Sequence, residues 1–244
     1  MLPWLHPHAA PRFPPVHHAL REPNGLLAAG GAMSPDWLLS AYRQGIFPWY
    51  SEDDPILWWS PDPRMVVIPG EMRLTRSLLK TLRNTPFTVR CDQDFSGVMQ
   101  ACADTRAQTG TWINTDIVAA YSALHRLGWA HSIETWHGEE LVGGLYGVAI
   151  GRVFYGESMF HRRSDASKIA FAHLVRLLEQ RNFAVIDCQM TTSHLQSLGG
   201  REIPRAQFLQ GLAQWTTEQL QPESWAHYDM SFDWRAVPRH EAAL

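Results

Sequence analysis

Three reactive side chains stand next to one another in the stretch NFAVIDCQM, residues 182–190. They are the carboxyl group of Asp187, the thiol of Cys188 and the carboxamide of Gln189. If this apolar stretch forms a β-strand, Asp187 and Gln189 share one face and Cys188 points to the other. A carboxylate beside Gln189 would accept a hydrogen bond from its side-chain amide and fix the direction of its carbonyl oxygen. The spacing thus favours an oriented hydrogen-bond acceptor. The alternative is that Asp187 only caps the strand and Gln189 is solvated.

Glu157 is a second acidic candidate. It follows Gly156 in the stretch FYGESMF, residues 154–160. If that strand neighbours the one carrying Asp187, two carboxylates meet at one opening and attract a cation. The alternative is a glutamate on the surface.

The thiol offers a different chemistry, that of a hydrolase or thioesterase in which His194 acts as the base for Cys188. Alternation along the strand argues against it, and we expect Cys188 to be a small buried hydrophobic side chain. The 12 histidines include no HExxH motif and no set of histidine and carboxylate at ligand spacing. We therefore expect no metal site.

Two regions must position these groups. Residues 1–70 are rich in proline and turn signals, and we expect a small N-terminal domain there, irregular over residues 1–20. Its one short helix begins after Ser34 and ends before Gly45.

From residue 71 onward the pattern predicts a larger domain, residues 71–244, of mixed helices and strands. Three strands follow one another without an intervening helix, and then come one long helix and one strand. This order resembles the core of the N-acetyltransferase superfamily, and we expect an α+β, GNAT-type mixed sheet flanked by helices. The predicted helices are residues 75–84, 95–104 and 166–181, together with one that has Ile117, Ala120, Tyr121 and Leu124 on one face. The predicted strands are residues 87–91, 131–136, 141–150, 152–160 and 183–190, and residues 105–112 are a predicted loop.

Charge and cysteine content narrow the function classes. The formal net charge is −3, so no global positive field draws the chain to nucleic acid, and any RNA contact must rest on a local patch. The 3 cysteines form no CxxC pair, which suits a reducing compartment. The start of the chain is not typical of a signal peptide, and no apolar segment has membrane length. We expect a cytoplasmic protein without a membrane partner.

Several long and unusual sequence motifs closely resemble those of the bacterial leucyl/phenylalanyl-tRNA–protein transferase family. They include GIFPWY (45–50), WWSPDPR (58–64), FYGESMF (154–160) and IDCQ (186–189), and the similarity runs in order from about residue 24 to residue 209. The resemblance implies transfer of Leu or Phe, and less readily Met, from aminoacyl-tRNA to the N-terminal Arg or Lys of a protein, which marks that protein for N-end rule degradation. It also implies a monomer with no added cofactor. The stretch FHRRSDASK has no glycine-rich pyrophosphate loop, so a CoA site is not expected.

The resemblance also implies roles for particular residues. Asp187 and Gln189 match the pair that relays a proton from the attacking amine to the departing ribose oxygen. Glu157, beside Gly156, resembles the acid that meets the ammonium group of the amino acid. The matching residues for the side-chain pocket are Leu145, Ile186 and Ser193, and those for stacking on the terminal adenosine are Trp49 and Trp112. Leu174 stands where some relatives have an aromatic residue.

For the tRNA backbone, two groups of basic residues are candidates. Arg73, Arg76, Lys80 and Arg83 recur at spacings of three and four, on one helical face. Arg162 and Arg163 precede the helix at 166–181, where backbone N–H groups add donors for phosphate. The alternative for the first group is a solvated helix face. A further alternative for the whole chain, with its 11 tryptophans, is a non-catalytic RNA-binding module.

Overall fold

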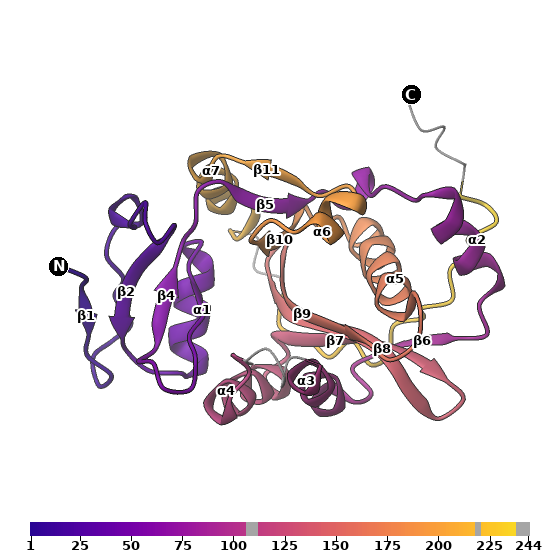
Figure 1. The fold of residues 1–244 in the computed structure, drawn as a ribbon, viewed down its shortest axis with the longest axis horizontal. Helices are drawn as coiled ribbons and strands as arrows, with labels where there is room; N and C mark the ends of the chain where they lie inside the picture. Colours follow the sequence, from indigo (N-terminus) through magenta and orange to yellow (C-terminus); the bar gives the residue numbers. More distant parts are fainter. Residues whose placement is uncertain (106–111, 218–220, 238–244) are drawn as a thin grey trace.

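The structure is a computed structural model that describes residues 1–105, 112–217 and 221–237. Two sheets organise it (Figure 1). The smaller sheet has the order β1-β2-β4-β3 and carries one helix, α1. Its elements are β1 (Trp4–Leu5), β2 (Leu26–Gly30), α1 (Pro35–Arg43), β3 (Phe47–Pro48) and β4 (Leu57–Trp59). Within residues 1–20, β1 pairs in parallel with β2, and a single 3₁₀ turn covers Val16–His18.

The larger sheet has seven strands in the order β11-β5-β10-β9-β8-β7-β6. Its β9 and β10 are parallel, and every other neighbouring pair is antiparallel. The strands are β5 (Arg64–Val67), β6 (Thr88–Cys91), β7 (Ala130–His137), β8 (Glu140–Ile150), β9 (Val153–His161), β10 (Val185–Gln189) and β11 (Arg201–Ile203). The meander β7-β8-β9, followed by a helix and then by β10, is the predicted acetyltransferase-like order, and the predicted fold class is confirmed.

The division between the two sheets falls a few residues earlier than residue 70. β5 belongs to the larger sheet, because it pairs with both β10 and β11. A boundary at residue 70 would separate this strand from its partners, so the sheets divide before Arg64. The extent of the domains as independent units stays a prediction.

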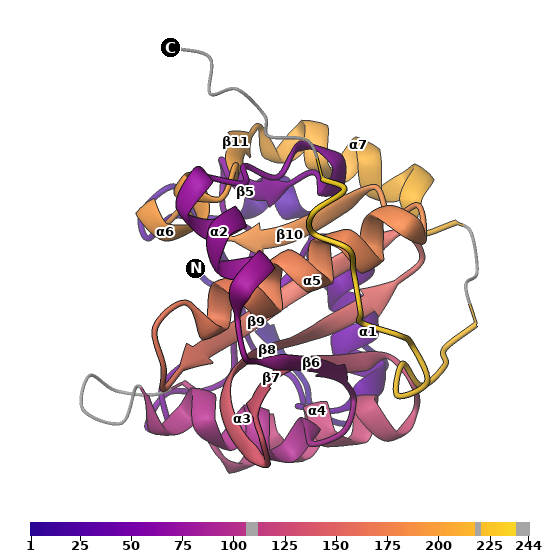
Figure 2. The ribbon, with the colours of Figure 1, turned by 90° about the vertical axis from the view of Figure 1, so that its right-hand side faces the viewer.

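Helices cover both faces of the larger sheet, as Figures 1 and 2 show. On one face α5 and α2 bury a core with Leu78, Ile169 and Leu178, while α3, α4 and α7 bury a second core with Val98, Leu124 and Phe208. The amphipathic pattern is the cause, since the buried residues of α2 and α4 recur at helical spacing. The helices are α2 (Arg76–Asn84), α3 (Phe95–Asp104), α4 (Thr115–Arg126), α5 (Ala166–Gln180), α6 (Ser193–Ser197) and α7 (Arg205–Trp215). A 3₁₀ turn, Pro69–Glu71, precedes α2, and most of the predicted loop at 105–112 lies outside the described residues.

Residues 225–237, which we call the C-terminal strap, run across the face that carries α5 (Figure 2). Trp225, Met230 and Trp234 of the strap are buried in the core of that face. The ring of Trp225 stacks on His131 with centroids 3.8 Å apart, and the indole N–H of Trp234 donates to Nε2 of His173 over 3.2 Å. The strap therefore closes one side of the larger domain.

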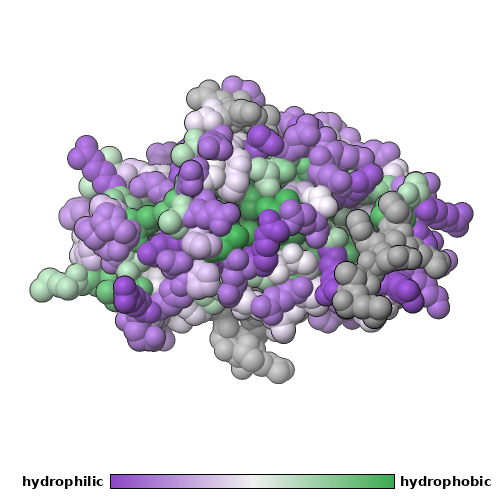
Figure 3. Space-filling view, turned by 90° about the horizontal axis from the view of Figure 1, so that it is seen from above, coloured by the Kyte–Doolittle hydropathy of each residue, from purple (hydrophilic) through white to green (hydrophobic). Residues whose placement is uncertain are grey.

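Among the described residues, the exposed large apolar side chains are Met1, Trp4, Leu20, Trp49, Leu127 and Met190. The face seen in Figure 3 is mostly hydrophilic, with apolar residues gathered in its middle. Across residues 1–105, 112–217 and 221–237, no helix is both long and apolar enough to cross a membrane.

Candidate active site

The site forms where β9 and β10 part. Their parallel pairing ends at Asp187 and Tyr155, and beyond this point each strand carries an irregularity. In β9 the register with β8 skips Glu157, and in β10 the register with β5 skips Cys188. Gln189 follows in the left-handed region, with φ of 62°. Such bulges bend a strand and redirect its side chains.

A cavity of about 390 Å³ opens at this point. Its apolar part is formed by side chains of β8, β9, β10 and α5, and its polar part includes Glu157 and Gln189. Trp49, which is 41% exposed, and Trp112 also contribute to it. The apolar residues between sheet and helix are Leu145, Phe154, Met159, Phe171, Leu174 and Ile186.

Most of the residues expected in the site line this one cavity. They are Trp49, Trp112, Leu145, Gly156, Glu157, Ile186 and Gln189. Two of the expected residues do not line the cavity. Asp187 is completely buried. Ser193 is exposed at the start of α6, where Thr192, His194 and Leu195 line the cavity instead. Ser193 is the first residue of α6 and is not among the residues that line the cavity.

The sequence predicted a hydrogen bond between the side chains of Asp187 and Gln189, and the structure contradicts this prediction. The Asp187 carboxylate accepts from Nε and Nη2 of Arg64 over 2.8 Å and 2.7 Å, and its Oδ1 also accepts from the backbone N–H of Gln189 over 3.0 Å. The physical reason is the bulge at Cys188, because one extra residue moves Gln189 off the face of Asp187. Asp187 therefore fixes the backbone of Gln189 and not its carboxamide.

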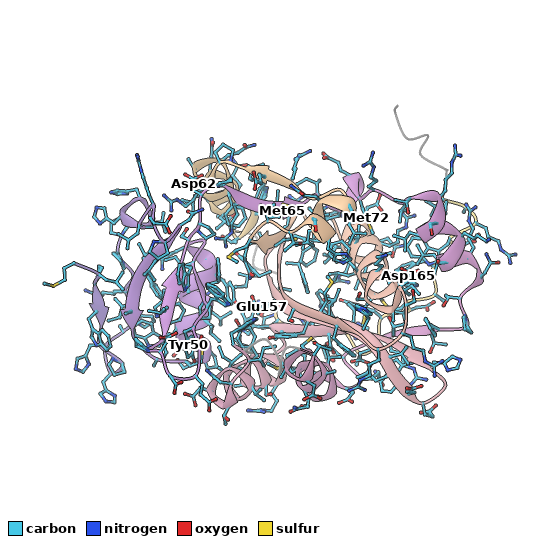
Figure 4. The ribbon with its side chains drawn as sticks, in the orientation of Figure 1. Tyr50, Asp62, Met65, Met72, Glu157 and Asp165 are labelled. Carbon is cyan, nitrogen blue, oxygen red and sulfur yellow. The ribbon has the colours of Figure 1, made fainter. Side chains whose placement is uncertain are left out.

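Glu157 fixes the carboxamide. Nε2 of Gln189 donates to Oε1 of Glu157 over 2.9 Å, which orients Oε1 of Gln189 as a free acceptor with no donor among the described residues. Glu157 lies at the centre of the molecule, where β9 faces the N-terminal sheet (Figure 4). Tyr42 and Tyr121 also donate to its two oxygens, over 2.6 Å and 3.0 Å. Burial raises the pKa of Glu157 to about 7, although the hydrogen bonds from Tyr42, Tyr121 and Gln189 act to lower it.

Three members of this site carried no signal in the sequence. Arg64 is fully buried between the rings of Phe47 and Phe208, with its guanidinium carbon 4.9 Å from each centroid. Arg64 is the last residue of the motif WWSPDPR, but this motif does not indicate a contact with Asp187, which lies 123 residues away in the chain. Tyr42 and Tyr121 are helix residues on apolar faces, where core packing is the ordinary expectation.

The thiol-based alternative finds little support. Cys188 and His194 both line the cavity, but burial and the nearby Asp187 carboxylate raise the pKa of the thiol, so that its nucleophilic thiolate is scarce at neutral pH. Burial and the charge of Lys168 lower the pKa of His194. Within the described residues no group of three or more His, Cys, Asp or Glu side chains could hold a metal ion.

The two groups of basic residues proposed for the tRNA backbone differ in how many of their side chains already bind other parts of the protein. Arg76 and Lys80 are exposed on α2, and Arg73 is exposed in the segment just before this helix. Arg83 is half-buried and donates to the carbonyl groups of Trp234 and Val237, so the expected four-residue stripe contains three exposed members. The other pair is engaged within the protein, as Arg162 donates to the carbonyl of Leu141 and Arg163 to the carboxylate of Glu140.

A mixed sheet that opens between two parallel strands, with a cavity at the opening, is the arrangement of the acetyltransferase-like fold class. Comparison with known sequences narrows this to one family. The chain belongs to the leucyl/phenylalanyl-tRNA–protein transferase family, whose members are aminoacyltransferases: the family profile matches residues 66–213, and the profile of its N-terminal domain matches residues 31–62.

Two relatives illustrate the extent of the match. The leucyl/phenylalanyl-tRNA–protein transferase of Azoarcus sp. (strain BH72) is 58% identical over 236 residues, covering 96% of this chain and 100% of the relative. That of Aromatoleum aromaticum is 60% identical over 227 residues, covering 93% and 95%. Among solved structures, a GCN5-related N-acetyltransferase-like protein from Streptococcus suis overlaps 69% of this chain and 64% of its own, with 12% identity and a TM-score of 0.34.

Proposed function

We propose that this chain transfers Leu or Phe, and less readily Met, from aminoacyl-tRNA to the N-terminal Arg or Lys of a protein. The observation that carries the proposal is the link between Glu157 and Gln189, 2.9 Å long, beside an apolar cavity. Glu157 supplies a carboxylate for the ammonium group of the donor amino acid, and Gln189 supplies an acceptor for the attacking amine. The cavity takes the apolar side chain, and because such pockets resolve one methylene by only about 1–3 kcal/mol, several related side chains are accepted.

The chemical step needs position more than basicity. The attacking α-amine has a reference pKa of about 7.7–8.0, so a substantial fraction is neutral at pH 7. Oε1 of Gln189 accepts a hydrogen bond from this amine and directs its lone pair to the ester carbonyl carbon. The C–N bond forms, the C–O bond to the ribose breaks, and the amine proton passes to the departing ribose oxygen. Asp187 contributes from behind, by holding the backbone of Gln189.

The donor would be held at both ends. Trp49 and Trp112 are available to stack on the terminal adenosine, an interaction worth about 1–3 kcal/mol per base. Arg73, Arg76 and Lys80 offer exposed positive charge for the tRNA backbone. The ester is already activated, so no added cofactor is required. We further propose a cytoplasmic monomer whose products enter N-end rule degradation.

Transfer of labelled Leu from Leu-tRNA tests the proposal. We expect label on a peptide that begins with Arg, none on the same peptide beginning with Ala, and a loss of roughly 100-fold or more in Gln189→Ala. Gln196→Ala is the matched control, because Gln196 is an exposed glutamine of α6 outside the cavity. Intact aminoacyl-tRNA with no labelled peptide would favour the RNA-binding module, and rapid hydrolysis lost in Cys188→Ser would favour the thiol enzyme.

A further inference from the structure

Trp49, the exposed tryptophan at the cavity, is in contact with a second tryptophan. Trp49 stands one residue beyond β3, which is an edge strand of the smaller sheet. Trp59 is the last residue of β4 and is buried. Its indole N–H donates to the backbone carbonyl of Trp49 over 2.6 Å, and the two rings meet at an angle of 65° with their centroids 5.4 Å apart. Trp59 thus contacts both the backbone and the ring of Trp49.

The register of β4 explains why Trp59, and not its neighbour in the strand, makes these contacts. Trp59 pairs with Phe47 of β3, and cross-strand partners project from the same face of a sheet. Phe47 lines the cavity, so Trp59 projects on the cavity side of the smaller sheet. Trp58 projects from the other face, where its indole N–H donates to the carbonyl of Gly30 over 2.8 Å. Trp59 itself is not among the residues that line the cavity, so it reaches a ligand through Trp49.

The backbone of Trp49 is fixed on both sides of its Cα atom. Its N–H donates to the carbonyl of Leu57 over 3.0 Å, and its carbonyl accepts from Trp59. The edge-to-face contact between the rings then restricts the side chain, because aromatic pairs favour particular orientations. Trp49 nevertheless stays 41% exposed and lines the cavity, so part of its ring is available to a planar ligand.

Holding Trp49 in place favours the binding of such a ligand. An unsupported tryptophan at the end of an edge strand would lose rotamer freedom when a base stacks on it, and this loss weakens binding. A ring that is already oriented before binding loses little of this freedom. Preorganisation of this kind raises affinity without any new contact to the ligand.

We propose that Trp59 is a positioning residue for donor binding, whose indole group fixes Trp49 in the orientation that stacks on the terminal adenosine of aminoacyl-tRNA. This inference rests on the proposed function of the site. The hydrogen bond and the ring contact of Trp59 both go to Trp49 and not to Glu157 or Gln189, so Trp59 affects the binding of the donor and not the chemical step.

Steady-state Leu transfer to an Arg peptide separates these two effects. Trp59→Phe keeps an aromatic ring but removes the N–H donor, and Trp59→Leu removes both contacts. We expect the KM for Leu-tRNA to rise about threefold in Trp59→Phe and about tenfold in Trp59→Leu, the size that corresponds to ordering one side chain. The values of kcat and of KM for the Arg peptide should remain those of the parent. A fall in kcat with an unchanged KM for Leu-tRNA would overturn the proposal.

Trp58→Phe is the matched control. It removes the same donor group from the neighbouring residue of β4, whose indole N–H bonds to Gly30 and whose ring stacks on Trp37. This variant should unfold at a lower urea concentration but keep the KM of the parent for Leu-tRNA. A rise in KM as large as that in Trp59→Phe would indicate a general loss of structure and contradict the positioning role.

A double-variant cycle asks whether Trp59 acts through Trp49. In Trp49→Ala no ring remains to be oriented, so adding Trp59→Phe should not raise the KM for Leu-tRNA any further. If the two substitutions instead raise KM independently, Trp59 acts by another route and the proposal fails.

Direct binding separates this inference from the proposed function. The probe is a non-hydrolysable amide analogue of leucyl-adenosine, and calorimetry measures its Kd without any transfer. We expect the Kd to rise in both Trp59 variants and not in Trp58→Phe. If the parent transfers no Leu but shows this pattern, the proposed function fails and the positioning role stands. If the parent transfers Leu but the Kd is unchanged in the Trp59 variants, or if the parent does not bind the analogue, the positioning role is overturned.

Discussion

Arg64 and Asp187 form a two-pronged ion pair in which neither side chain has exposed surface. Nε and Nη2 of Arg64 donate to separate oxygens of Asp187, and Nη1 donates to the carbonyl of Gly45 over 3.1 Å. The pair ties the turn after α1 to the strand that ends at Gln189. The acidic residue that the sequence analysis placed in the chemistry is thus bonded away from the cavity.

Removing one partner of the Arg64–Asp187 ion pair should lower the stability of the folded protein. Arg64→Met leaves the Asp187 carboxylate buried and unpaired, and we expect a loss of about 3–5 kcal/mol in the free energy of unfolding, measured by urea denaturation. The double variant Arg64→Met, Asp187→Leu should recover most of this stability but little activity, since the backbone N–H of Gln189 loses its acceptor. Arg201→Met is the control, because Arg201 pairs with Glu71 on the surface and should cost at most about 1 kcal/mol. A change in Arg64→Met as small as that of the control would contradict the prediction.

Replacing the thiol should leave the reaction nearly intact. Cys188 lines the cavity, but burial raises its pKa and the thiolate is scarce. We expect Cys188→Ser to retain most of the Leu transfer measured with an Arg peptide. A loss as large as that of Gln189→Ala would instead make the thiol part of the chemistry.

Acid should weaken the protein through His173. Its Nε2 accepts from Trp234, and burial lowers its pKa from the usual 6.5 to about 4. Between these pH values the unfolded chain binds a proton that the folded chain does not, so stability rises with pH across the window and is lost as pH falls. The loss amounts to about 3 kcal/mol. Urea unfolding at pH 7 and pH 4.5 should show a smaller drop for His173→Gln, which cannot titrate. Equal drops in the parent and in His173→Gln would refute the assignment.

The basic residues of α2 should separate into two classes. Arg76→Ala and Lys80→Ala should weaken tRNA binding and flatten its dependence on salt by about 0.7–0.9 per lost phosphate contact. Arg83→Ala should lower stability instead, because Arg83 holds the carbonyl groups of Trp234 and Val237. Binding at several salt concentrations, with unfolding measured in parallel, distinguishes the two. Unaltered salt dependence in Arg76→Ala and Lys80→Ala would place the tRNA contact elsewhere.

Periodicity predicted most of the fold, because helices and strands with one buried face carry their pattern in the local sequence. Residues 95–104 and 166–181 were expected as helices and are α3 and α5, with the second ending one residue earlier. The bulge at Cys188 was not predictable, since a bulge depends on the partner strand and leaves no fixed pattern. It overturned the expected contact between Asp187 and Gln189.

The residues that complete the site escaped prediction for a related reason. Each acts through a partner that is remote in the chain: Tyr42 meets Glu157 across 115 residues, and Arg64 meets Asp187 across 123. Local spacing contains no information about such pairs. The family resemblance pointed to the cavity but not to the side chains behind its wall.

These long separations also bear on how the protein folds. Loop closure over more than 100 residues precedes the gain from such contacts, so they are expected to form late, after helices and hairpins. A partly folded chain with all its helices formed would still lack the Arg64–Asp187 ion pair and the contact between Tyr42 and Glu157. We therefore expect Leu transfer to appear during refolding only after these long-range contacts have formed, later than the helical signal in circular dichroism.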